Sequence, residues 1–126
     1  MSGRVHSVFG ALIGLNVLKI LNQNQYILLF VPVYIIGALL PDIDLHTSAL
    51  GKIFFPISYP LNKIFGHRTI THSFFGLSIF NLILYYILNI VFNNSINQSL
   101  IVYIHFHFSI GYLTHLFSDM LTYKGV

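Results

Sequence analysis

The acidic residues of this chain lie in two short motifs, and both motifs are typical of metal ligands. The 126 residues include three acidic residues, all of them aspartate. Asp42 and Asp44 end one apolar stretch, and Asp119 follows His115 by four residues near the end of another. On a helix this spacing puts His115 and Asp119 on one face, where they can bind the same ion. The same spacing also suits a simple hydrogen bond, so this pair by itself leaves both interpretations open.

Asp42 and Asp44 follow a proline, which disfavours helical geometry at Leu40. If the segment is extended, alternation directs both carboxylates to one side. One aspartate could instead cap a following turn, but a cap leaves the second aspartate unexplained. A carboxylate at lipid depth costs about 2.5–3.5 kcal/mol. A divalent cation that offsets this cost is therefore the favoured interpretation.

A third motif, between the other two in sequence, contains His67, Arg68 and His72. The two histidines are five residues apart, so they do not share a helix face. We expect a helix to start between them, with Thr69 or Thr71 as its N-cap. His67 would then approach the site from a loop and His72 from the first turn. Arg68 could bind a substrate anion or orient a carboxylate, or it could contact lipid headgroups.

Mixed histidine and carboxylate ligands without cysteine suit Zn²⁺, Mn²⁺ or Fe²⁺ better than Ca²⁺, and we expect Zn²⁺ ahead of the other two. The candidates exceed what one tetrahedral ion needs. The site therefore holds either two ions or one ion and a general base. An open position on such an ion lowers the pKa of bound water to about 7 and supplies hydroxide. The sequence thus predicts hydrolysis, without naming the bond that is cut.

Composition places these motifs in a membrane. Hydrophobic residues make up 56% of the chain and charged residues 7%, whereas soluble domains carry roughly 25% charged residues. The mean hydropathy is +0.78. The absence of cysteine excludes a disulfide framework and a thiolate site. The small, scattered basic excess gives no support to nucleic-acid binding.

Four apolar stretches, at residues 8–21, 26–40, 74–92 and 100–117, predict an all-α integral membrane bundle of about four transmembrane helices. The first two are short for a bilayer and would need flanking residues or local thinning. We expect the first to be an uncleaved span and not a signal peptide. Residues 42–73 form a long link between the second and third helices. Its apolar and aromatic portion, residues 51–65, could lie on the membrane interface.

The distribution of basic residues predicts the orientation. Lys52, Lys63 and Arg68 place the long link in the cytoplasm, and four spans then put both termini on the same side. Lys19 disagrees with this arrangement and would have to snorkel outward. All candidate ligands, including His6 at the start of the first span, then lie at the cytoplasmic face.

The three motifs resemble those of the YdjM-like family, whose members are classed as membrane-bound, metal-dependent hydrolases and are linked in some bacteria to the LexA-controlled DNA-damage response. The matching segments are Gly37-Ala38-Leu39-Leu40-Pro41-Asp42-Ile43-Asp44, Phe65-Gly66-His67-Arg68 with Thr71-His72-Ser73, and Gly111-Tyr112-Leu113-Thr114-His115 with Asp119-Met120-Leu121-Thr122 and Gly125-Val126. The resemblance implies a bacterial inner (plasma) membrane protein. The chain departs from the family pattern at Thr69, where glycine is common. It also ends at Val126, where relatives continue with an apolar segment, so residues 1–126 are expected to form one C-terminally short domain.

Together these arguments predict one ligand set and two catalytic residues. The predicted metal ligands are His6, Asp42, Asp44, His67, His72, His115 and Asp119, and the catalytic candidates are Asp44 and Arg68. His105 and His107, neither of them one helical turn from His115, are expected to pack inside the bundle. A fainter similarity to zinc-dependent phospholipase C and P1-type nucleases favours a phosphoester, and membrane lipid is the expected partner.

Three rival classes remain. A metal-free lipid phosphatase would use His115 and Asp119 as a nucleophile pair, but it needs more phosphate-binding groups than Gly66 and His67 suggest. A transporter would use histidine and aspartate as a metal or proton path, although transport sites usually lie near the midplane. A structural membrane protein would use an ion only to hold helix ends together. A water-accessible coordination position would argue against the last of these.

Overall fold

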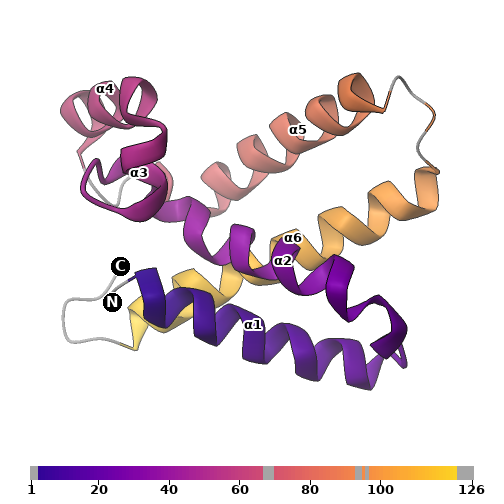
Figure 1. Ribbon diagram of the computed structural model, residues 1–126. Helices are drawn as coiled ribbons and strands as arrows, with labels where there is room; N and C mark the ends of the chain where they lie inside the picture. The colour runs from indigo at the N-terminus through magenta and orange to yellow at the C-terminus, as the bar shows by residue number, and fades with distance from the viewer. Residues whose placement is uncertain (1–2, 67–69, 93–94, 96, 122–126) are drawn as a thin grey trace.

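The computed structural model describes residues 3–66, 70–92, 95 and 97–121, and the secondary structure of these residues is entirely helical (Figure 1). The predicted all-α fold class is confirmed. The elements are α1 (Gly3–Ile20), a 3₁₀ turn (Asn24–Tyr26), α2 (Ile27–Leu39), a second 3₁₀ turn (Leu40–Asp44), α3 (Ala49–Ile53), α4 (Phe55–Phe65), α5 (Phe74–Val91) and α6 (Gln98–Met120).

Three helical segments are long and apolar enough to cross a membrane: Asn24–Asp44, Phe74–Val91 and Gln98–Met120. The two 3₁₀ turns extend α2, which explains how a short apolar stretch reaches spanning length. Helix α1 is the same length as α5 but is less apolar, since it includes Asn16 and Lys19. A fourth span through α1 stays a prediction.

Helices α1, α2 and α6 form the packed core. Its buried side chains belong to two clusters, one of Leu18, Phe30 and Tyr34 and the other of Phe108, Tyr112 and Leu116. Helix α5 lies apart from α1 (Figure 1). Only 6% of its residues are buried, against 39% and 44% of the residues in the apolar stretches of the other two spans. Most of its surface is therefore available to lipid.

Glycines allow α2 and α6 to cross closely. A methyl group on Gly111 would lie 2.9 Å from the Tyr34 Cα, and one on Gly37 would lie 3.0 Å from the Tyr112 nitrogen. Small residues of this kind let helix backbones approach in membranes. The close crossing fixes the end of α2 against the last turns of α6, where the candidate ligands lie.

The segment that carries Asp42 and Asp44 is a 3₁₀ turn, so the expectation of extended backbone is wrong. Leu40 keeps helical angles (φ −67°, ψ −33°) despite the following proline, and Pro41 occupies the first positions of the turn. A proline costs little there because its missing N–H would be unsatisfied anyway. Packing of the end of α2 on α6 outweighs the local bias at Leu40.

Helix α5 begins later than expected. Its N-cap is Ser73, whose hydroxyl accepts from the Gly76 N–H at 3.1 Å. Thr71 is therefore not the cap, and Thr69 lies outside the described residues. His72 precedes the helix and does not belong to its first turn. Ser73 is the cap because its backbone is extended (φ −139°, ψ 163°), and its short side chain reaches the N3 amide from there.

The ends that matter for function lie together. The start of α1, the end of α2, the start of α5 and the end of α6 all lie at the end of the bundle from which α3 and α4 project (Figure 1). Helix α4 exposes aromatic and aliphatic side chains, including Phe55, Ile57 and Tyr59. A location of residues 51–65 at the membrane interface stays a prediction.

Candidate metal centre

Five buried side chains from four parts of the chain meet at this end of the bundle. His6 comes from α1, Asp42 from the 3₁₀ turn after α2, His72 from the segment before α5, and His115 and Asp119 from α6. The ligand atoms form two overlapping groups, and within each group they lie within 4.8 Å of one another. One group is His6, His115 and Asp119, and the other is Asp42, His72 and His115. The structure thus brings three distant sequence motifs, and His6, into one cluster.

Four of the ligand atoms lie close enough to share a metal ion. They are Asp42 Oδ1, His72 Nε2, His115 Nε2 and Asp119 Oδ2. The two histidine nitrogens lie 3.1 Å from each other and 3.6–3.8 Å from each of the two carboxylate oxygens. Zinc bound at 2.0–2.2 Å requires edges of about 3.3–3.6 Å in a tetrahedron. These five separations therefore suit an ion of this size with small adjustments.

The protonation of His115 is determined by its environment. Its Nδ1 lies 2.7 Å from the carbonyl oxygen of Ala38, and because a carbonyl only accepts, Nδ1 must carry the proton. A neutral His115 then presents the lone pair of Nε2 to the interior of the cluster. Metal-binding histidines usually donate their second N–H in this way, which fixes the tautomer and orients the ring.

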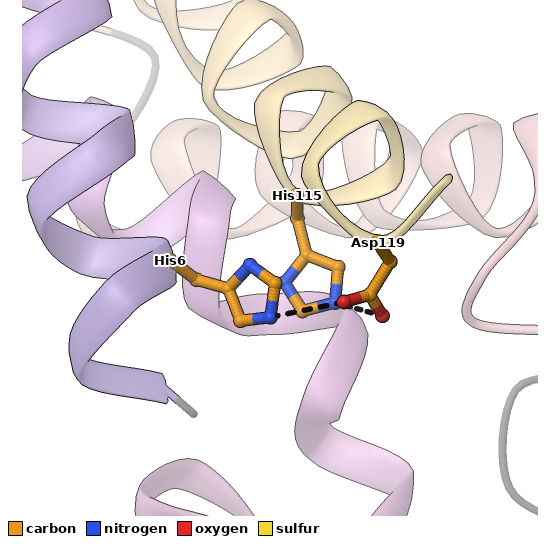
Figure 2. A group of neighbouring side chains, drawn as sticks. All are labelled: His6, His115 and Asp119. Atoms are coloured by element: carbon orange, nitrogen blue, oxygen red, sulfur yellow. Dashed lines mark ion pairs between the residues drawn. The ribbon is translucent and has the colours of Figure 1, made fainter. Parts of the chain in front are cut away.

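The same argument applies to His6 through Ser118. The serine hydroxyl donates to the carbonyl oxygen of His115 at 2.9 Å, so its oxygen can only accept from His6 Nδ1, also at 2.9 Å. His6 Nε2 then lies 3.4 Å from Asp119 Oδ1. Figure 2 shows His6 and His115 side by side with Asp119 at their Nε2 edges, and their rings stack with centroids 3.7 Å apart.

Histidine nitrogens and carboxylate oxygens face one another in this cluster. Asp42 and Asp119 both form ion pairs with His72 and His115, and Asp119 forms one with His6 as well. His115 Nε2, which carries no proton, lies 3.1 Å from His72 Nε2. A proton on His72 Nε2, or a cation between the two nitrogens, would relieve the repulsion between their lone pairs. A divalent cation there would also attract both carboxylates.

His72 is held by the segment around it. The Tyr112 hydroxyl donates to the carbonyl oxygen of Thr71, and Ser73 Oγ donates to that of Ile70 at 2.5 Å. The Thr71 hydroxyl lies 3.2 Å from His72 Nδ1. A loop residue is thereby positioned almost as firmly as a helical one.

Asp42 and Asp44 point in different directions. A 3₁₀ helix has three residues per turn, so positions two apart differ by about 240°, and the two carboxylates do not lie on one side as they would on an extended strand. The Asp42 backbone is fixed by Ser48, whose hydroxyl donates to its carbonyl oxygen at 2.7 Å. Asp44 is buried and lines a small cavity with Leu61, Gly66 and other residues. It belongs to neither group of neighbouring ligands found among the described residues.

Two other predicted site residues, His67 and Arg68, lie outside the described residues. His105 and His107 pack inside the bundle, as expected. His107 Nδ1 lies 2.7 Å from the Tyr34 hydroxyl, and His105 Nδ1 lies 2.7 Å from Asn81 Oδ1.

Sequence reasoning missed the groups that orient the ligands. Ser118 lies inside the last motif, next to Asp119, and Tyr112 lies one turn before His115, yet neither was assigned a role. The Ala38 carbonyl could not have been identified, because its contact with His115 depends on how α2 and α6 cross. Helical spacing from His115 was the one available signal for Ser118 and Tyr112.

Comparison with known proteins adds a family to this geometry. A family model described as "YdjM inner membrane protein" matches residues 1–126. The inner membrane protein YdjM of Escherichia coli K12 is 38% identical over 96 residues, which cover 76% of this chain and 46% of that protein. YvsG of Bacillus subtilis 168, an uncharacterized protein, is 34% identical over 92 residues, covering 72% and 50% respectively. This chain spans about half the length of the curated relatives it matches, and no solved structure matches it.

Proposed function

Because this chain belongs to the family of YdjM inner membrane proteins, we propose that it is a membrane-bound, metal-dependent hydrolase. The observation that carries the proposal is the cluster of Asp42, His72, His115 and Asp119, in which the two histidine Nε2 atoms lie 3.1 Å apart and 3.6–3.8 Å from an oxygen of each aspartate. These residues are buried and come from three separate motifs of the sequence. In this proposal residues 1–126 act as a single hydrolase-like domain.

The four side chains offer two imidazole nitrogens and two carboxylates, a set that suits Zn²⁺ ahead of Mn²⁺ or Fe²⁺. When bound, such an ion supplies Lewis acidity and activates water. The chain's own part is to hold the donors in place: Ala38 orients His115, Thr71 orients His72, and Ser118 orients His6. Asp42, whose side chain is 12% exposed while those of His72 and His115 are 0% exposed, marks the side from which water approaches.

The remaining predicted residues extend this core. His6 and the second oxygen of Asp119 could hold a second ion, or could handle a proton beside the first. Asp44 and Arg68 stay as catalytic candidates, and His67 stays as a candidate ligand. We favour a phosphoester as substrate and the cytoplasmic face of the bacterial inner membrane as the location, with both termini cytoplasmic. Hydrolysis would consume one water, add its hydroxyl to phosphorus and transfer a proton to the leaving oxygen.

The direct test is hydrolysis by purified protein in detergent, measured with aryl phosphomonoesters, aryl phosphodiesters and phospholipids. We expect turnover that chelation abolishes and Zn²⁺ restores, and that falls to background in Asp119→Asn. His105→Gln, which removes a histidine from the middle of the bundle, serves as the matched control and should keep activity. Turnover that survives chelation, or that Asp119→Asn leaves intact, would refute the proposal.

A structural metal site is the second candidate, and one observation favours it. Four protein donors complete a tetrahedron, which is the arrangement of structural zinc sites, whereas catalytic sites keep an open position. The two functions differ in one outcome. A structural ion would raise thermal stability with no hydrolysis of any ester, while the hydrolase needs a further position at the ion, reached by expansion to five ligands.

A further inference from the structure

An apolar groove of about 260 Å³ opens between the start of α5 and the end of α6. Its walls include Phe74 from α5 and Leu113, Leu116, Phe117 and Met120 from α6. His72, one of the four clustered donors, also lines it. The groove thus lies beside the candidate metal centre at the outside of the bundle, with the buried His72 side chain between them.

We propose that this groove holds the hydrocarbon chain of a membrane lipid whose phosphoester headgroup lies at the metal centre. The proposal rests on the proposed function, because that function supplies the ion for the headgroup. It adds the substrate class: a lipid that enters sideways from the bilayer, in place of a small ester that arrives from water.

The position of the groove selects the lipid as occupant. Both helices that form it are long and apolar enough to cross the membrane. Three of the side chains that line it, Phe74, Phe117 and Met120, are largely exposed on these two helices. The groove carries no Lys, Arg, Asp or Glu, and the hydroxyl of Ser73, which also lines it, is already bonded to the Ile70 carbonyl and the Gly76 N–H. A water-soluble substrate would therefore find few polar partners there. A hydrocarbon chain would instead bury apolar surface along its length.

The position along the helices also fits. The groove involves the first turn of α5 and the last two turns of α6, and α3 and α4 project from the same end of the bundle (Figure 1). Helix ends of spanning segments lie near the level where lipid headgroups meet acyl chains. A lipid beside α5 could therefore keep its chain at the depth of the groove while its headgroup reaches the donors.

The test uses Co²⁺ in place of the native ion, so that binding is read from the visible spectrum and does not depend on turnover. Ethyl phosphate and dodecyl phosphate are titrated into the Co²⁺-loaded protein in detergent. Leu113→Trp fills the groove, and Met120→Trp does so at its mouth. Val102→Trp is the matched control, since it adds the same side chain to an exposed position elsewhere on α6. Micelles concentrate dodecyl phosphate equally for all variants, so the difference between variants is the measurement.

Because each buried methylene contributes to binding, we expect wild type and Val102→Trp to respond to dodecyl phosphate at concentrations about tenfold lower than Leu113→Trp and Met120→Trp do. Ethyl phosphate should bind all four proteins alike. If Co²⁺ and ethyl phosphate bind but the groove variants respond to dodecyl phosphate as Val102→Trp does, this inference is wrong and the proposed function stands. If Co²⁺ does not bind at all, the proposed function fails and this inference fails with it.

Discussion

Which ring nitrogen carries the proton decides which nitrogen of a histidine can bind a metal. In His115 the carbonyl of Ala38 fixes the proton on Nδ1. In His6 the carbonyl of His115 does so through Ser118. Both His115 and His6 then direct Nε2 toward Asp119. Such orienting contacts typically change metal affinity by 10–100-fold when removed.

Ser118→Ala should therefore weaken metal binding at the group of His6, His115 and Asp119 by about tenfold, because His6 Nδ1 loses its acceptor and the ring can turn away from Asp119. The affinity is measured by competition with a chelator of known strength. Ser78→Ala is the matched control: its hydroxyl bonds only the carbonyl of Phe74 in its own helix, at 3.0 Å. Equal affinities for the two variants would show that Ser118 does not orient a ligand.

The sequence was informative about ligands and weak on their supports, for a physical reason. Acidic residues are so rare in this apolar chain that their positions alone made Asp42, Asp44 and Asp119 candidates, and the histidines near them followed. Hydroxyls such as Ser118 are common in helices and mostly bond their own backbone. The sequence could not show that the carboxylates of Asp42 and Asp44 point in different directions. Side chains two residues apart lie on the same side of a strand but on different sides of a 3₁₀ turn, which is the structure found here.

At the level of elements, the crossing of α2 and α6 sets the distance between Ala38 and His115. Gly37 and Gly111 permit the crossing, since a side chain on either would overlap the backbone of the other helix. The period and length of the apolar stretches predicted these helices. They could not predict which faces cross, because that depends on which small residues happen to face each other.

Gly111→Ala should destabilise the protein by about 1–3 kcal/mol through overpacking, and should weaken metal binding as His115 moves away from Ala38. The unfolding midpoint in detergent reports the first effect. Gly3→Ala is the control, since its methyl group would meet only the Leu39 side chain at an ordinary 3.5 Å. There the helix preference of alanine should leave stability unchanged or slightly raised. A Gly111→Ala variant as stable as Gly3→Ala would contradict the crossing.

For the whole molecule, the arrangement gathers every described ligand at one end of the bundle (Figure 1). The order of apolar stretches predicted this, because consecutive spans alternate direction and each motif lies at the same end. What composition could not settle is whether α1 crosses the membrane, since Asn16 and Lys19 reduce its apolar character.

The absence of cysteine allows a clean test of this topology. Single cysteines in place of Asn24, Thr47 and Ser95 are treated with a maleimide that cannot cross the membrane of intact cells. If the long link is cytoplasmic, Thr47→Cys should react only after permeabilisation, while Asn24→Cys and Ser95→Cys should react at once. Reaction of Thr47→Cys from outside would invert the orientation, and protection of Asn24→Cys would mean that α2 does not cross as described.

The most direct test of the metal centre is the metal content of the purified protein after reconstitution with Zn²⁺. We predict near-stoichiometric metal in the wild type, its loss in Asp42→Asn and His115→Gln, and its retention in Asp44→Asn and His105→Gln, because neither Asp44 nor His105 belongs to either group of neighbouring ligands among the described residues. Loss in both of the first pair would show that two distant motifs share one site. A folded wild-type protein that stays metal-free, or an Asp42→Asn variant that keeps its metal, would contradict the account.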